Sequence, residues 1–288
     1  METHLLWDLW KLSTQTVTGL RVMGLMTSQD NTNSLYSLSI QIHLDGLSFF
    51  TQNSHSKEVI ATQTIKFTNN VNPTSLSNEV EKAFKNNEIL SQNFAKVIVV
   101  YSNELFTMVP KALFDVEKGA DYLKFNTKIL STDHISHDVI DFYDLVNVYV
   151  PYTSVNNFLF ETFGSFDYYH STTVFTKFLL NKFVNSTEPK ILTNFQDSYF
   201  EMGIVANKKL LFVNRFEIRT KEDFIYYMLF TMEQLELSPE TIEVVLTGTI
   251  TKDDPYYELA HTYVRHLSVL EAVHTQIPQD QAILGSLL

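Results

Sequence analysis

The alternation of apolar and polar residues over positions 190–264 predicts three strands, a helix, a fourth strand and a second helix. Runs rich in β-branched and aromatic residues are broken by polar turns at 196–198 and 207–209, which is typical of an antiparallel meander. The rest of the chain is organised around this stretch. The three strand runs cover 190–195, 199–205 and 210–218.

The apolar spacing then lengthens to that of a helix over 221–237, where no Gly or Pro interrupts the chain. Thr220 followed by Asp223 has the pattern of a capping box, which satisfies free amides in a first helical turn. Because apolar residues occupy more than one stripe, we expect this helix to be covered on most sides. These residues are Phe224, Ile225, Tyr227, Met228, Leu229, Phe230, Met232 and Leu235.

A short β-branched run at 241–248 ends in glycine and predicts a covered strand of a parallel sheet. Asp254 then has the position of a helix cap, with Pro255 as the first helical residue. Apolar residues from Tyr256 to Leu267 repeat at helical spacing and predict a final helix.

The same order of elements occurs once before, over 35–108. Asp45 and Gly46 separate two alternating runs and predict a hairpin, because glycine tolerates a positive φ. A third strand at 59–67, a helix beyond Pro73 and a covered strand at 96–101 follow. The fold class is therefore α/β, with two tandem mixed sheets that carry helices on their faces.

Shorter strands and helices are expected over 105–184, and the polar stretch 185–189 is the expected junction between the halves. The apolar N-terminus has no place in the repeat, so we expect a peripheral extension. The alternative is an amphipathic helix that docks on a partner or a membrane. The expected divisions are an extension at 1–34, a first subdomain at 35–186, a second at 187–275 and a tail at 276–288.

Charge and composition exclude several classes of function. The chain has 288 residues with 21 basic and 33 acidic side chains, and this net charge of −12 argues against non-specific nucleic-acid binding. The absence of Cys removes thiol chemistry and disulfides, and it fits a reducing cytoplasm. No apolar run is long enough to span a membrane, and Glu2, Asp8 and Lys11 interrupt any signal-peptide core.

The histidines offer weak candidates for chemistry. His134 and His137 lie beside Asp133 and Asp138, a spacing that could hold a metal, but no third ligand is identifiable and a solvated loop is favoured. His170 follows two tyrosines and is expected to pack at the edge of the core. No nucleophile elbow, Walker loop or dinucleotide fingerprint occurs, so we expect no catalytic residue and no metal ligand.

Several motifs resemble a bacterial family of uncharacterised proteins that has the duplicated ribonuclease H-like fold of the actin-like ATPase superfamily. The resemblance covers roughly 35–273. It rests on YSNELFTMVPKALF at 101–114, DYLKFN at 121–126, YHSTT at 169–173, LLFVNRFEIRTKEDFIYY at 210–227 and LTG at 246–248.

This resemblance implies nucleotide binding between the halves, through two phosphate hairpins and a glycine-rich adenosine turn. Glycine lets the backbone approach phosphate oxygens, and aspartate holds a metal ion and orients water. The cleft candidates are Asp45, Gly46, Asp197, Glu201 and Gly248. The second hairpin, 194–201, departs from the pattern because it has no glycine, and its aromatic side chains would crowd a phosphate.

The sequence therefore favours a degenerate ATPase, expected to bind no cofactor and to act in the cytoplasm as a scaffold for a protein partner. The alternative is a nucleotide-binding ATPase or kinase-like enzyme that uses ATP and Mg²⁺ at those five residues. A third interpretation follows superfamily relatives at the inner membrane in cell division and pilus assembly, with the N-terminus supporting peripheral membrane association.

Overall fold

The computed structural model describes residues 35–67, 71–270 and 276–287. Contacts between residues divide them into two compact units. Residues 105–151 form the small unit, and the other described residues form the large unit. The expected extension at 1–34 lies outside the described residues.

The first sheet of the large unit has the strand order β3-β2-β1-β4-β8. The hairpin predicted at Asp45 and Gly46 is confirmed, because β1 and β2 pair antiparallel around that turn. β4 pairs parallel with β1, and β8 pairs parallel with β4, so the sheet is mixed as predicted. The strands are β1 (Tyr36–His43), β2 (Gly46–Asn53), β3 (Val59–Lys66), β4 (Lys96–Tyr101) and β8 (Asp167–His170).

The second sheet repeats this arrangement, with the order β11-β10-β9-β12-β13. Three antiparallel strands are again followed by two parallel ones, which confirms the predicted duplication. The helical spacing through Leu267 was misleading, because Leu267 lies in β13 and pairs with Val244 of β12. The strands are β9 (Lys190–Phe195), β10 (Tyr199–Ala206), β11 (Lys209–Glu217), β12 (Glu243–Gly248) and β13 (His266–Val269).

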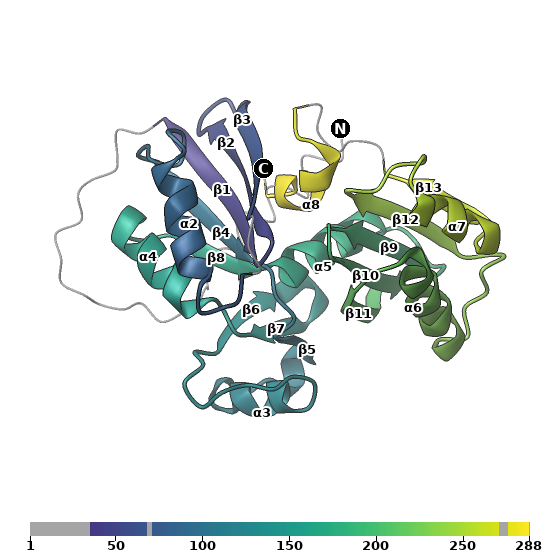
Figure 1. The fold of residues 1–288 in the computed structure, drawn as a ribbon. Helices are drawn as coiled ribbons and strands as arrows, with labels where there is room; N and C mark the ends of the chain where they lie inside the picture. The colour runs from purple at the N-terminus through teal and green to yellow at the C-terminus, as the bar shows by residue number, and fades with distance from the viewer. Residues whose placement is uncertain (1–34, 68–70, 271–275, 288) are drawn as a thin grey trace. The chain divides into compact units, whose positions relative to one another are not determined.

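Helices cover both sheets of the large unit (Figure 1). Leu38 and Ile40 of β1 are fully buried in one cluster with residues of α2 (Leu76–Lys85) and α4 (Thr153–Phe163). The second sheet has its own cluster, beneath α6 (Lys221–Gln234) and α7 (Pro255–Tyr263). α5 (Ser171–Lys182) packs on β10 and β11, where Gly203 leaves room for Leu179 and Phe175.

The predicted caps are confirmed at two helices. Thr220 and Asp223 form the capping box of α6, and Asp254 caps α7 with Pro255 at its first turn. The expectation that α6 is covered on most sides is wrong, because Tyr226 and Phe230 are 60% and 47% exposed. These two rings stack on each other on the outer side of the helix, which lessens their exposure to water.

The small unit is an antiparallel sheet with the order β5-β7-β6, packed against a short helix. Its core contains Val109, Leu123, Val146 and Val148. β6 includes His137, although a solvated loop is favoured by the sequence around His134 and His137. The elements are β5 (Phe106–Pro110), η1 (Lys111–Leu113), η2 (Val116–Lys118), α3 (Gly119–Lys124), β6 (Ser136–Ile140), η3 (Asp141–Tyr143) and β7 (Leu145–Tyr149).

Residues 276–287, which we call the closing segment, contain η4 (Gln279–Gln281) and α8 (Ala282–Gly285). They belong to the large unit, where α8 lies close to β1, β12 and α5. Nothing in the sequence predicted that this tail would be buried. Across the described residues, no helix combines the length and the apolar character that crossing a bilayer requires.

Candidate functional site

The turns of the two equivalent hairpins in the large unit meet each other. The hydroxyl of Ser198, in the β9–β10 turn, donates a hydrogen bond to the carboxylate of Asp45, in the β1–β2 turn. Lys66, the last residue of β3, forms an ion pair with Asp197 beside Ser198. Two of the predicted candidates, Asp45 and Asp197, are thus brought to one place, and each already has a partner.

Four residues contact one another where β4 ends, β10 begins and β11 nears its end. The hydroxyl of Tyr199 lies 2.7 Å from Oγ of Ser102, and Nη1 of Arg215 donates to the same Oγ at 3.2 Å. The guanidinium carbon of Arg215 lies 3.5 Å from the centre of the Tyr199 ring, which is close enough for a cation–π contact. The hydroxyl of Tyr152 donates to the Ser102 carbonyl at 2.9 Å.

Burial holds these hydroxyls in their protonated form. It raises the pKa of Tyr199 to about 12, and it also raises the pKa of Tyr152, although Arg215 opposes both shifts. Burial lowers the pKa of the nearby His43 to about 4, so this imidazole is neutral at pH 7. Its Nδ1 accepts the backbone N–H of Asp45 at 3.2 Å and thereby fixes the first turn.

Glu201 is a buried carboxyl group that joins α5 to the second sheet. It accepts hydrogen bonds from Thr172 Oγ1 and Asn194 Nδ2, each at 3.0 Å, and from Ser171 Oγ at 3.2 Å. Burial raises the pKa of Glu201, and the hydrogen bond from Asn194 is the largest effect that opposes this shift. Within the described residues, no group of three or more His, Cys, Asp or Glu side chains is placed to hold a metal ion.

The two candidate glycines sit where two backbones approach closely. A Cβ at Gly46 would collide with the carbonyl oxygen of Ile65 on the neighbouring strand. Gly248 has a φ of +90°, and a Cβ there would collide with the Phe195 carbonyl oxygen and lie 2.6 Å from its nitrogen. Strand packing therefore accounts for both glycines.

The three candidate histidines differ in their burial. His170 is fully buried, as expected, and its Nδ1 accepts the N–H of Thr172 at the start of α5. His134 is exposed, whereas the ring of His137 lies 4.9 Å from that of Phe114.

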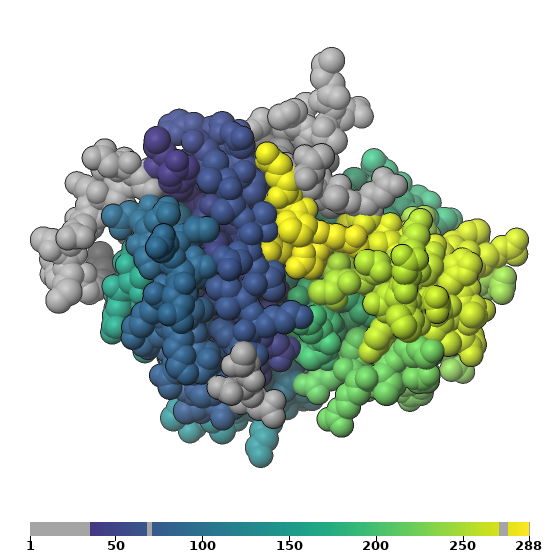
Figure 2. All heavy atoms as spheres, turned by 45° about the horizontal axis from the view of Figure 1, so that its top comes forward, coloured from purple at the N-terminus to yellow at the C-terminus, as the bar shows by residue number. Residues whose placement is uncertain are grey.

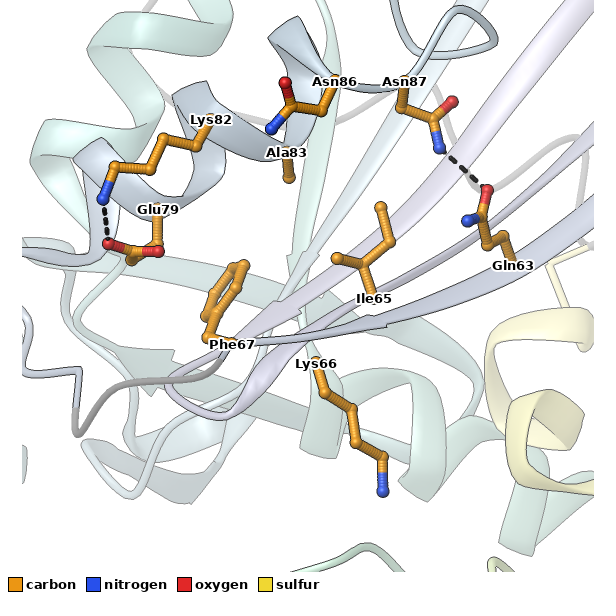
Figure 3. Close-up of a pocket in the computed structure, with 9 residues that line it drawn as sticks. All are labelled: Gln63, Ile65, Lys66, Phe67, Glu79, Lys82, Ala83, Asn86 and Asn87. Carbon is orange, nitrogen blue, oxygen red and sulfur yellow. Dashed lines mark hydrogen bonds and ion pairs between the residues drawn. The ribbon is translucent and has the colours of Figure 1, made fainter.

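A hollow of about 360 Å³ lies between β3 and α2 in the large unit. Figure 3 shows its apolar floor at Ile65 and Phe67. Glu79 and Lys82 at its rim bind each other at 2.6 Å, and the Lys66 side chain points away from it. None of the five predicted candidates lines this hollow, and its rim offers no nucleophile beside a base.

Sequence reasoning missed Ser102 and Arg215, which both contact Tyr199 beside the second turn. Arg215 gave one available signal, because it is an isolated charge on an apolar strand run. Ser102 follows a covered strand directly, which is where ligand-binding residues often lie in α/β proteins. The closing segment gave only weakly apolar positions and no distinctive signal.

Comparisons with known proteins identify the family and the fold. Residues 27–267 match the family described as "Protein of unknown function (DUF3822)". A Bacteroides thetaiotaomicron structure, described as having an actin-like ATPase fold and unknown function, matches with a TM-score of 0.74 at 23% identity. That match covers 91% of this chain and 99% of the other.

A chain of the PilM–PilN type IV pilus biogenesis complex matches with a TM-score of 0.58 at 11% identity, over 87% of this chain and 97% of the other. A search of curated proteins finds no match. The family match covers most of the chain, and each of the two structural matches covers 87% of it or more. This chain therefore belongs to the DUF3822 family and has the actin-like ATPase fold.

Proposed function

We propose that this protein is a degenerate member of the actin-like ATPases that acts in the cytoplasm as an interaction or scaffold protein, without catalysis. One observation carries this proposal. The two hairpin turns that enclose phosphates in the superfamily are bonded to each other here, through Asp45 with Ser198 and Lys66 with Asp197.

The residues at these turns do not fit a nucleotide polyphosphate. Phosphate binding favours free backbone N–H groups and glycines that permit close approach. The second turn has no glycine, and both turns present carboxylates. Tyr199 directly follows the second turn, and its ring and Ser102 hold the guanidinium of Arg215. A bound triphosphate would have to break these contacts.

The fold itself favours the alternative, a nucleotide-binding ATPase or kinase-like enzyme. In that case Asp45, Asp197 and Glu201 would act around Mg²⁺, with Gly46 and Gly248 beside the nucleotide. Against it, Glu201 is buried and its oxygens already accept three side-chain hydrogen bonds. A carboxyl group with a raised pKa is also a poorer ligand for a divalent cation.

Thermal unfolding in Mg-ATP separates these two functions. A ligand that binds the folded state at one hundred times its dissociation constant adds about 2.7 kcal/mol of stability. That increase would raise the melting temperature by several degrees. We expect no rise at millimolar Mg-ATP beyond the change produced by Mg²⁺ alone.

A matched pair of variants makes the result specific. If Mg-ATP raised the melting temperature by binding at the two turns, Asp45→Asn should abolish that rise. Asp121→Asn makes the same charge change at an exposed position of α3 and serves as the control. A shift that Asp45→Asn removes and Asp121→Asn retains would establish nucleotide binding at the turns and end the proposal.

Binding to a protein partner is the positive part of the proposal. One structural neighbour is a chain of a complex with two named components, the PilM–PilN type IV pilus biogenesis complex. The alternative of peripheral membrane association depends on residues 1–34, outside the described residues. The net charge of −12 disfavours contact with anionic lipid.

A further inference from the structure

β3 is the outermost strand of the first sheet, where β2 is its one partner in the described part of the chain. Directly after β3, the N–H of Phe67 donates to the Asp45 carbonyl at 2.8 Å. The backbone groups of an antiparallel strand alternate in direction, so every second residue before Phe67 also bonds to β2. The residues between them, which include Thr62 and Thr64, point their N–H groups away from the sheet. No hydrogen-bond partner of these two N–H groups occurs among the described residues.

This edge lacks most of the features that protect strand edges from other chains. Such edges are usually short, contain Pro, or have charged side chains that discourage pairing. β3 has 8 residues without Pro, and its one charged residue is Lys66 at its end. A bulge opposite Thr51 and Gln52 disturbs only its first residues, so 61–66 form a regular edge. The corresponding edge strand of the second sheet, β11, has charges at Lys209, Arg215 and Glu217.

The hollow of about 360 Å³ lies alongside this same strand. Its lining comes from α2 with the two residues after it, and from β3 with Phe67. Figure 3 shows the short side chain of Ala83 in α2 facing the space over Ile65 and Phe67. Hydrogen-bonded polar pairs lie at its two ends, Glu79 with Lys82 and Gln63 with Asn87. The hollow is therefore an apolar space between a helix and an unpaired strand edge.

A strand added to β3 would place alternate side chains over this hollow. Opposed residues of paired antiparallel strands lie on one face of the sheet, about 4.5–5.5 Å apart. Side chains opposite Gln63 and Ile65 would point to α2, and a side chain opposite Thr64 would point to the other face. Gln63 and Thr64 are exposed, so both faces have room at this edge. Backbone hydrogen bonds would supply affinity, and the hollow would select an apolar side chain.

The other face of β3 has an acidic group beside it. Oγ1 of Thr64 donates to Oδ2 of Asp280, in the closing segment, at 3.4 Å. No ion pair of Asp280 is found among the residues that the structure describes. Figure 2 shows the dark blue strands of this edge between the lighter blue spheres of α2 and the yellow closing segment.

Charge decides which occupant fits. A basic side chain opposite Thr64 would meet the Asp280 carboxylate, and the net charge of −12 would favour its approach. An acidic segment would be repelled. A second copy of this chain has the same net charge of −12, so pairing of β3 with itself is disfavoured.

We propose that β3 and the hollow form a docking site for an extended segment of a partner protein, which adds to the first sheet as a further strand. The segment alternates apolar residues, which enter the hollow, with basic residues, which lie beside Asp280. It pairs with the regular edge at 61–66. This inference rests on the proposed function, because it gives the scaffold a site and names the class of partner.

A phage-displayed library of random decapeptides, selected on the full-length chain, is the first test. We expect the selection to enrich peptides in which apolar residues alternate with Lys or Arg. No enrichment, or enrichment without this alternation, would overturn the proposal. The peptide that is enriched most is then labelled, and its dissociation constant is measured by fluorescence anisotropy.

One pair of variants tests the edge of β3. Thr62→Pro removes an N–H that points away from the sheet and leaves the bonds to β2 intact. We expect it to weaken peptide binding about tenfold, through a lost backbone hydrogen bond and the ring beside the new strand. Thr62→Val keeps the N–H and should bind like the unaltered chain. Equal binding to the two variants would overturn the use of this edge.

A second pair tests the hollow. Ala83→Leu places a larger side chain in the space over Ile65 and Phe67 and should also weaken binding about tenfold. Lys85→Leu adds the same side chain to α2 at an exposed position that does not line the hollow, so it is the control. Equal affinities in these two variants would contradict the role of the hollow.

Asp280 tests the predicted charge of the segment. Asp280→Asn should weaken binding and reduce its dependence on salt, because a basic side chain of the peptide loses its carboxylate partner. Asp121→Asn makes the same charge change in the small unit and should leave both unchanged. Equal salt dependence in the two variants would overturn the basic character of the segment.

Hydrogen exchange on the unaltered chain keeps the proposal testable if a variant does not fold. The peptide should slow exchange at the amides of Thr62 and Thr64 about tenfold, and leave those of Ala61 and Gln63, already bonded to β2, unchanged. Protection at another strand edge in place of β3 would overturn the proposal. A dimer that dissociates on Thr62→Pro would assign the edge to a second copy and overturn the partner segment.

These outcomes are separate from those with nucleotide. The absence of a rise in melting temperature with Mg-ATP, together with no selected peptide, would overturn only the docking site. A rise with Mg-ATP that Asp45→Asn removes would overturn the proposed function, whatever the peptides do.

Discussion

At the scale of single residues, two buried histidines couple the stability of the protein to pH. Burial lowers the pKa of His43 to about 4 and that of His170 to about 3, and in His170 the charge of Arg215 adds to the effect. Between these values and 6.5, the unfolded chain binds more protons than the folded one. Stability is therefore present above pH 6.5 and is lost as the pH falls.

We expect each of these histidines to contribute a slope on the order of 1.4 kcal/mol per pH unit within its window. His170→Asn should flatten the slope below pH 6.5, because asparagine keeps an acceptor for the Thr172 N–H but does not titrate. Urea unfolding at pH 5 and pH 7 measures the difference, and His134→Asn at an exposed position is the control. If the unfolding free energy of His170→Asn fell with pH as steeply as that of the unaltered chain, His170 would not be a source of the pH dependence.

Glu201 acts in the opposite direction. Its pKa is raised by burial, so the folded chain binds more protons above pH 4.5, and this contribution to stability is lost as the pH rises. The net pH dependence at low pH is the balance of the two effects. For this reason the test compares slopes between variants and does not use absolute stability.

A substitution at Gly248 tests whether close packing of the backbone requires glycine at this candidate site residue. Gly248→Ala forces a side chain into a φ of +90° and against the backbone of Phe195. Gly164→Ala meets only the first difficulty, because its φ is +75° and no atom lies within 4 Å of the new Cβ. We expect Gly248→Ala to be the more destabilising in urea unfolding, with backbone strain alone costing about 1–3 kcal/mol. Equal losses of stability in the two variants would show that the close approach to Phe195 does not affect stability.

At the scale of elements, local chemistry could be predicted where it is self-contained. The Asp45 turn, the α6 capping box and the α7 cap each depend on residues within one turn, so the sequence was sufficient. The last helix was extended too far because helical spacing at Leu267 coincides with strand pairing to β12. Pairing between strands distant in sequence has no local signal.

The α6 cap gives a prediction for one element. Thr220→Ala removes the hydroxyl that accepts the Asp223 N–H and should cost about 0.5–2 kcal/mol of unfolding free energy. Thr220→Ser retains the hydroxyl and should recover most of that loss in the same denaturant titration. Equal losses in the two variants would show that the cap contributes little.

At the scale of the whole molecule, duplication could be predicted from the sequence because each half repeats the same order of strands and helices. The contacts between the two hairpin turns, and those made by the closing segment, could not be predicted. The Asp45–Ser198 bond joins residues 153 positions apart, and the Gln281–Thr64 bond joins residues 217 positions apart. Contacts across such separations depend on the folded sheets, so the sequence could not predict the partners of Asp45 and Asp197.

The proposed loss of nucleotide binding depends on two hairpin turns that are bonded to each other. A calorimetric titration of the full-length protein with Mg-ATP tests this most directly, because it detects binding without relying on a change in stability. We predict no heat beyond that of dilution at millimolar nucleotide. Saturable heat with a dissociation constant below about 1 mM, lost in Asp45→Asn, would contradict the account.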